Sequence, residues 1–155
     1  MKNIIKIHLK TKEDYKNRYN EEILSYDLSN YILEEIKAIK SNQKIEFIVS
    51  SNFPMYDNEK NQFVDMIRNN FGTNISEIIK LSKKENIANT LIFITGIFFL
   101  ILYSLFKINF VSEFILILGW VFIGETICNA LYHGIEKRLK IKRRKQIIDA
   151  KIVFE

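Results

Sequence analysis

The chain has 155 residues, of which 48% are hydrophobic and 26% are charged, and its formal net charge is +5. Its single cysteine, Cys128, excludes a disulfide framework within the chain, and two histidines add too few ligands for a metal cluster. The charge is uneven, because residues 1–86 carry a net +1, residues 87–134 a net −1 and residues 135–155 a net +5. The basic character therefore belongs to the C-terminal tail.

The N-terminal part has the pattern of a small α/β domain. Hydrophobic and polar residues alternate at residues 5–9 and 45–49, which predicts two half-buried strands. Between them we expect a helix that begins near Asp27 or Ser29, either of which could cap it. The predicted buried positions are Ile5, Ile7 and Leu9 in the first strand, Leu28, Ile32, Ile36 and Ile39 in the helix, and Ile45, Phe47 and Val49 in the second strand.

Another helix is expected after Pro54, the only proline. Asp57 could cap this helix, and Gly72 is placed to stop it, because glycine accepts the left-handed conformation at a helix end. The buried stripe would consist of Phe63, Val64, Ile67 and Phe71.

The order strand–helix–strand–helix favours a parallel pair of strands. Two strands alone make a weak sheet. We therefore expect the short, β-branched segment at residues 150–154 to dock as a third strand, in the same subunit or in a neighbour. The alternative is a frayed terminus.

Two long apolar runs lie at residues 87–106 and 110–132. Each has about the 20 residues that a helix needs to cross ~30 Å of hydrocarbon, so we predict a transmembrane hairpin. Positive charge before the first run and after the second places both termini in the cytoplasm. The expected fold is an α+β membrane protein with a cytosolic α/β domain at 1–84, a helical hairpin at 85–134, and a basic cytosolic helix and C-terminal strand at 135–155.

The turn of this hairpin would consist of residues 107–109, which include Lys107. No helix breaker follows Gly134, so we expect the second span to continue unbroken into the basic helix. Trp120 lies in the middle of the second run, between Gly119 and Gly124. This placement suggests packing against another helix, and the alternative is a side chain that faces lipid.

Glu125 lies inside the second run, roughly 22 Å along the helix from Phe110. An ionisable side chain at this depth is costly unless it faces protein or water. One interpretation is a polar stripe that lines an ion path between copies of the second helix. A second is an interhelical hydrogen bond, with Glu125 protonated or paired to Asn129, Thr95 or Ser104. A third is a tilt that brings Glu125 near a headgroup. The residues predicted to share the face are Glu125, Asn129, Tyr132, Phe122 and Leu118.

A dense basic segment follows the second run. It could enforce topology, bind anionic headgroups, or bind the phosphates of a nucleotide or oligonucleotide. Its residues are Lys137, Arg138, Lys140, Lys142, Arg143, Arg144 and Lys145.

No catalytic constellation emerges from the sequence, which has neither a phosphate loop nor a nucleophile elbow. His8 and His133 belong to no metal-ligand or triad spacing. The loop Ser50–Asn52 follows a strand, where open α/β sheets tend to bind ligands, but no glycine-rich phosphate loop accompanies it. We therefore expect that the chain is not an enzyme and that it binds neither a cofactor nor a metal ion.

The segments Gly119–Glu125, Lys142–Gln146 and Ala150–Phe154 resemble a family of small two-span bacterial membrane proteins. The layout is similar to membrane effectors of anti-phage systems, in particular the channel effector of Hailong defence. The resemblance implies a homo-oligomeric channel, with a tetramer favoured. Its cytosolic domain would sense a nucleotide-type ligand made by a nucleotidyltransferase partner, and opening would depolarise the infected cell.

The expected function is therefore a ligand-gated ion channel or pore in the bacterial inner membrane, built from several copies because two spans cannot enclose an aqueous path. The alternative is a non-conducting membrane anchor, scaffold or regulator for a cytosolic partner. An enzyme that acts through the Ser50–Asn52 loop is a third hypothesis.

Overall fold

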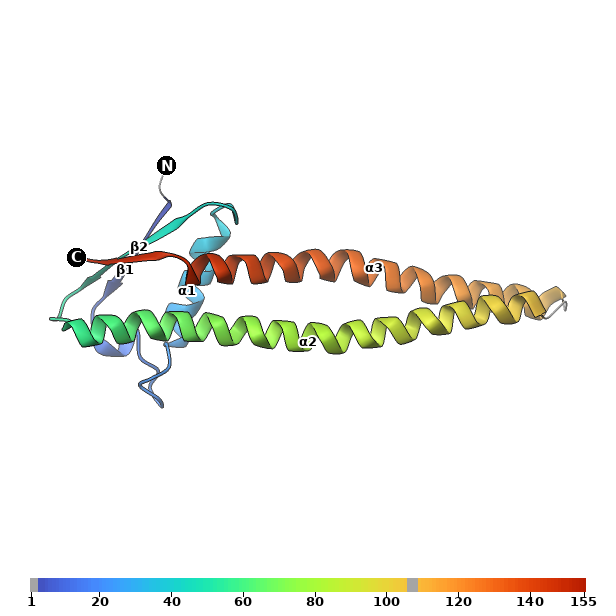
Figure 1. Cartoon of the computed structure of the whole chain (residues 1–155), viewed down its shortest axis with the longest axis horizontal. Helices are drawn as coiled ribbons and strands as arrows, with labels where there is room; N and C mark the ends of the chain where they lie inside the picture. Colours follow the sequence, from blue (N-terminus) through green and yellow to red (C-terminus); the bar gives the residue numbers. More distant parts are fainter. Residues whose placement is uncertain (1–2, 106–108) are drawn as a thin grey trace. The chain divides into compact units, whose positions relative to one another are not determined.

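The computed structural model of the chain describes residues 3–105 and 109–155 (Figure 1). The described part divides into two compact units, Met1–Glu77 with Leu139–Glu155 and Ile78–Arg138, which we call the α/β unit and the helical unit. The elements in chain order are β1 (Asn3–Leu9), a 3₁₀ helix (Lys12–Asp14), α1 (Tyr26–Lys37), β2 (Ile45–Ser51), α2 (Asp57–Leu105), α3 (Asn109–Ile148) and β3 (Lys151–Phe154).

The sheet of the α/β unit has three parallel strands in the order β1-β2-β3. The two strands predicted from alternation are both present, and their parallel pairing is confirmed. The predicted third strand is also present, because β3 pairs with β2 of the same chain, with Ile152 opposite Phe47. The last strand of the chain therefore completes a sheet that begins at its first strand.

One face of the sheet supports the hydrophobic core. Ile5, Ile7 and Leu9 of β1 and Phe47 and Val49 of β2 are buried, as their alternation predicts. Burial of each such side chain contributes about 1.5–3 kcal/mol. The helical side chains that cover this face include Leu28, Ile32 and Ile36 of α1, Phe63, Met66, Ile67 and Phe71 of α2, and Ile147 of α3.

Helix α1 begins earlier than predicted, and its cap is neither Asp27 nor Ser29. Ser25 caps it, because the Ser25 hydroxyl oxygen accepts a hydrogen bond from the backbone N–H of Leu28 at 3.3 Å. The Ser29 hydroxyl donates instead to Asn70 Oδ1 at 3.2 Å. Leu28, Ile32 and Ile36 are buried as predicted, whereas Ile39 lies beyond the end of the helix at Lys37 and is half-buried.

Gly72 does not end a helix, so this prediction is wrong. Helix α2 runs without interruption from Asp57 to Leu105, and no described glycine has a positive φ. A glycine inside a helix costs only about 1 kcal/mol relative to alanine, and no proline follows that would force a stop. Asp57 is the first residue of this helix rather than its cap. Met66 is fully buried, whereas Val64 is half-buried.

The helical unit is a packed pair of helices that run in opposite directions. The rings of Phe99 and Phe122 stack at 5.7 Å between centroids. The two helices approach each other closely at Gly96 and Gly119, because an added Cβ would meet the other helix at both positions. The predicted turn at residues 107–109 and the end of the first run fall largely outside the described residues, so the hairpin connection stays a prediction.

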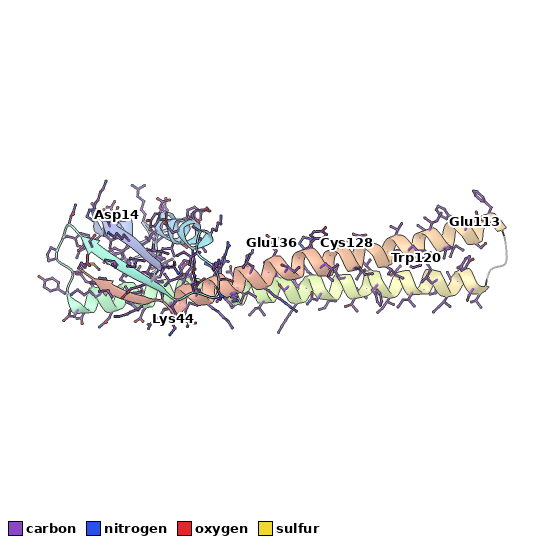
Figure 2. All side chains as sticks on the ribbon, turned by 90° about the horizontal axis from the view of Figure 1, so that it is seen from above. Asp14, Lys44, Glu113, Trp120, Cys128 and Glu136 are labelled. Carbon is purple, nitrogen blue, oxygen red and sulfur yellow. The ribbon has the colours of Figure 1, made fainter. Side chains whose placement is uncertain are left out.

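Helix α3 continues without a break into the basic segment, as predicted. Both α2 and α3 are long and apolar enough to cross a membrane. Only 6% of the apolar window of each is buried within the chain, so neither resembles the core helix of a soluble protein. Figure 2 draws the side chains along the two helices and labels Trp120. The Trp120 side chain is 64% exposed, so α2 does not cover it.

The glycine at the helix crossing can be tested by Gly96→Ala. The new methyl group would lie 2.8 Å from Ile123 Cγ1 and 3.2 Å from the Gly119 carbonyl oxygen. The helices must then move apart, and we expect a loss of about 1–3 kcal/mol in stability, measured by thermal unfolding of the full chain in detergent.

Gly72→Ala is the matched control in the same helix. No atom lies within 4 Å of its added Cβ, so this variant should be neutral or gain up to about 1 kcal/mol from helix propensity. Equal stability of the Gly96→Ala variant and the wild type would contradict the close approach.

Candidate functional site

A surface cavity of about 630 Å³ lies at the amino ends of β2 and β3 in the α/β unit. Its walls come from the segment that leads into β2 and from the last turns of α3. We call it the basic cavity. Its lining residues are Ser41, Asn42, Gln43, Lys44, Ile45, Glu46, Lys142, Lys145, Gln146, Asp149 and Lys151.

Positive charge predominates in the basic cavity, with four lysines against two carboxylates. Lys151 Nζ lies 3.6 Å from Glu46 Oε1, so these two charges largely offset one another. The ammonium groups of Lys44, Lys142 and Lys145 have no hydrogen-bond or ion-pair partner among the described residues. Asp149 is the one other carboxylate of the lining, so positive charge remains in excess and favours an anionic ligand.

Gln146 fixes the wall of the cavity that α3 provides. Its Nε2 donates to the carbonyl oxygens of Lys40 at 3.1 Å and Gln43 at 2.6 Å. One turn earlier on the helix, the Arg143 guanidinium donates to the carbonyl oxygen of Lys37 at 3.4 Å. Gln146 Oε1 is buried and has no hydrogen-bond partner within the described chain. The cavity therefore combines charge for phosphate groups with one acceptor left for a ligand N–H or O–H.

The seven basic residues predicted as a group do not share one environment. Lys142 and Lys145 line the basic cavity, whereas Arg143 and Arg144 are half-buried beside it. Arg144 donates to the carbonyl oxygen of Lys140, and burial lowers the pKa of its guanidinium group.

The other two basic residues belong to the helical unit. Lys137 forms an ion pair with Glu85 of α2, and Arg138 is exposed. Sequence reasoning missed Lys44, Lys151 and Gln146. Recognising them requires the parallel register of β3 on β2, which brings residues 41–46 and 142–151 together.

Helix packing divides the residues that were predicted to share a polar face on α3. Phe122 stacks on Phe99, and Asn129 Nδ2 donates to Asn89 Oδ1 at 3.5 Å, so both lie toward α2. Leu118 is half-buried. Glu125 and Tyr132 are instead exposed. Within one chain, the contact with α2 therefore covers one edge of the predicted face and leaves Glu125 and Tyr132 exposed.

The predicted pairing of Glu125 with Asn129, Thr95 or Ser104 is not formed within the chain. Thr95 donates to the carbonyl oxygen of Leu91 at 2.9 Å, and the Ser104 hydroxyl also donates to a carbonyl oxygen of its own helix. The Glu125 carboxylate has no hydrogen-bond or ion-pair partner within residues 3–105 and 109–155. The hydroxyl protons of Thr95 and Ser104 are therefore committed to their own helix.

A polar cluster that the sequence analysis did not single out joins α2 to α3. Its side chains line a small cavity of about 190 Å³. They recur every four residues on each helix, a spacing that would have identified the cluster. Its polar members are Glu85 and Asn89 on α2, and Asn129, His133 and Lys137 on α3.

The carboxyl ends of β1 and β2 carry polar side chains, which bond mainly to one another and to the backbone. His8 Nδ1 lies 2.9 Å from the Ser50 hydroxyl oxygen, across paired strands. The Ser51 hydroxyl donates to the carbonyl oxygen of Phe53 and so holds the loop, and the backbone N–H of Asn52 bonds to Leu9. In the described part of the chain, no three His, Cys, Asp or Glu side chains lie together in a way that could hold a metal ion.

Asp14 lies near this end of the sheet, and its carboxylate stabilises the turn after β1. Its carboxylate accepts hydrogen bonds from the backbone N–H groups of Thr11 at 2.9 Å and Lys10 at 2.6 Å. These bonds, with that from the Thr11 backbone foremost, lower the pKa of Asp14 below its usual 3.8. The group is therefore ionised at neutral pH and committed to the turn after β1.

Comparison with protein-family models, with curated proteins and with solved structures finds no match to this chain. A functional argument therefore rests on the chain's own residues.

The turn held by Asp14 gives a pH-dependent prediction. Because folding lowers the pKa of Asp14, its contribution to stability is present above pH about 4 and is lost as the pH falls through the lower pKa of the folded state. Asp14→Asn should lower stability by about 1 kcal/mol at pH 7, as for a lost capping carboxylate, with a smaller difference at acid pH.

Thermal unfolding of the full chain between pH 3 and pH 7 measures this difference, with Glu13→Gln as the control for the loss of one adjacent charge. A difference between Asp14→Asn and wild type that grows on acidification would contradict the assigned role.

Proposed function

We propose that this chain is a homo-oligomeric effector of the bacterial inner membrane that forms a gated ion path and is regulated by a phosphate-bearing ligand at the basic cavity. The apolar helices would cross the bilayer, with both termini in the cytoplasm. The ligand would be a nucleotide or an oligonucleotide, supplied by a nucleotidyltransferase partner. The resemblance to anti-phage effectors adds the expectation that opening depolarises an infected cell.

The observation that carries the proposal is the exposed apolar surface of α2 and α3. Only 6% of each apolar window is buried by the chain itself. Contiguous apolar surface of this extent is costly in water and favourable in hydrocarbon. The basic segment after the second apolar run supports a cytoplasmic C-terminus, because lysine and arginine gather on that side.

The ion path would form between copies of α3. Two helices that pack directly on each other leave no aqueous route between them, so a path needs several chains. Glu125 is exposed, without a described partner, within the apolar part of α3. A ring of carboxylates from several copies would attract cations into such a path.

Regulation by a ligand is supported by the continuity of α3. The helix carries Lys142 and Lys145 of the basic cavity and Glu125 of the apolar segment without a break between Asn109 and Ile148. A helix is a stiff element, so a shift of its basic end on ligand binding would bias the position of its apolar part. Differential affinity of the ligand for two positions of α3 would set the direction of gating.

A flux assay in liposomes tests the ion path. We expect the wild type to conduct, and Glu125→Ala to reduce cation flux by roughly tenfold or more, because the carboxylate ring no longer concentrates cations. Glu125→Gln keeps the shape and hydrogen-bonding capacity, so its comparison with Glu125→Ala separates charge from packing. Unchanged conductance in both variants would contradict the proposal.

Binding of a fluorescently labelled single-stranded oligonucleotide tests the basic cavity. Lys142→Gln with Lys145→Gln should weaken binding roughly tenfold and reduce its salt dependence, because two phosphate contacts are lost. Lys6→Gln with Lys10→Gln is the matched control, since it removes the same charge from the α/β unit outside the cavity. Equal weakening by both pairs would show only a general effect of net charge.

A non-conducting membrane anchor for a cytosolic partner is the alternative. It is favoured by the packing of Phe122 and Asn129 against α2, which leaves a narrower polar surface on α3 for an ion path. This alternative predicts no flux from any variant and an unchanged membrane potential on overexpression.

A further inference from the structure

Helix α3 packs one face against α2 and leaves another without a partner inside the chain. Gly119 and Phe122 lie on the packed side, within contact of Leu100 and Phe99. A second set of residues falls within about 100° of arc on the helix, away from that side. We call it the Glu125 face, and it consists of Val121, Gly124, Glu125, Cys128 and Tyr132.

The Glu125 face holds an ionisable group in an apolar setting. Val121 is 56% exposed, and Glu125 and Cys128 are exposed as well. In hydrocarbon the carboxyl group needs a hydrogen-bond partner at its own depth. On α2, the Thr95 hydroxyl donates to its own helix and Asn89 Oδ1 accepts from Asn129, and neither group bonds to Glu125 among the described residues. The site is therefore incomplete in one copy of the chain.

Gly124 makes this face suited to a close helix contact. An added Cβ at Gly124 would meet nothing within 4 Å, whereas one at Gly119 would meet Leu100 at 2.7 Å. Gly119 therefore allows the close contact with α2, whereas Gly124 has no helix packed against it among the described residues. Gly124 and Cys128 are four residues apart, and small residues at this spacing allow helices in membranes to approach closely.

We propose that the Glu125 face is the contact between copies of this chain, so that α3 helices meet there and each copy contributes its Glu125 to a shared carboxyl site. The inference rests on the proposed membrane homo-oligomer and adds the surface through which it assembles. A protonated carboxyl group donates to the carboxylate oxygen of its neighbour, so one residue type supplies both donor and acceptor.

A second copy is the occupant that this face fits. Copies that insert with the same topology carry Glu125 at the same depth, so the carboxyl groups meet without any shift along the helix. The lipid chains at this depth offer no hydrogen-bond donor. A face that is its own complement also suits the closed symmetry of most homo-oligomers.

The single cysteine lies on this face and reports the contact directly. A disulfide requires Cα atoms within about 7 Å. Oxidation of the full chain in native membranes with copper–phenanthroline should therefore link two copies through Cys128, which is visible as a dimer on a non-reducing gel. The matched control is Cys128→Ser with Ile127→Cys, because residue 127 lies at the same depth, is 51% exposed, and is turned about 100° from residue 128.

We expect several-fold more dimer from the wild type than from this control. Gly124→Leu should abolish the Cys128 crosslink, because the larger side chain separates the two α3 helices. Gly134→Leu should not change the crosslink, because Gly134 also has space for a side chain but lies outside the Glu125 face. Glu125→Ala should lower the yield several-fold, and Glu125→Gln should retain it. A control that crosslinks as well as the wild type would overturn the inference.

Oligomer size, measured in parallel by a lysine-reactive crosslinker, separates the two proposals. An oligomer that forms without any Cys128 crosslink would refute the Glu125 face and leave the proposed homo-oligomer standing. A chain that stays monomeric by both measurements would refute both.

Discussion

The structure depends on one constraint, which is that α2 and α3 cannot bury their apolar surfaces against each other. Two helices in contact cover only a narrow stripe of each, and most of the large hydrophobic side chains between residues 87 and 135 stay exposed. This surface must meet lipid or other protein. The polar cluster around Asn89 and Asn129 and the ion pair between Glu85 and Lys137 lie in the same unit. They fix the register of the pair with directional bonds that hydrocarbon packing alone would not supply.

In the α/β unit, the stability of the small sheet depends on its third strand. Two parallel strands bury too little surface, and the chain completes the sheet with β3, its last element. Ile147 and Ala150, which lead into this strand, are buried in the core. The two long helices are therefore an insertion between neighbouring strands β2 and β3. The first turns of α2 and the last turns of α3 both contribute side chains to the core of the α/β unit.

The same strand addition creates the basic cavity. Lys44 precedes β2 and Lys151 begins β3, so parallel pairing brings them to one end of the sheet. The last turns of α3 add Lys142 and Lys145 to that end. A basic tail that would otherwise be a solvated charge cluster thereby becomes one wall of a defined hollow, held in place by the bonds from Gln146 to the loop carbonyls.

Elements whose signal is local could be predicted from the residues alone. Alternation identified β1 and β2, helical spacing identified the buried faces of α1 and α2, and the two apolar runs identified the helices that could enter a membrane. Features that depend on residues distant in the chain became visible only in the folded arrangement. Gly72 continues a helix, and it has no positive φ. Ser25 rather than Asp27 caps α1, and the backbone N–H of Ser25 is held by the Tyr15 carbonyl oxygen at 2.8 Å. Glu125 and Asn129, one turn apart, were assigned to one face by spacing alone. The contact with α2 covers Asn129 in part and leaves Glu125 exposed. The covered part of a helix depends on its partner, and a sequence does not contain the direction from which that partner approaches.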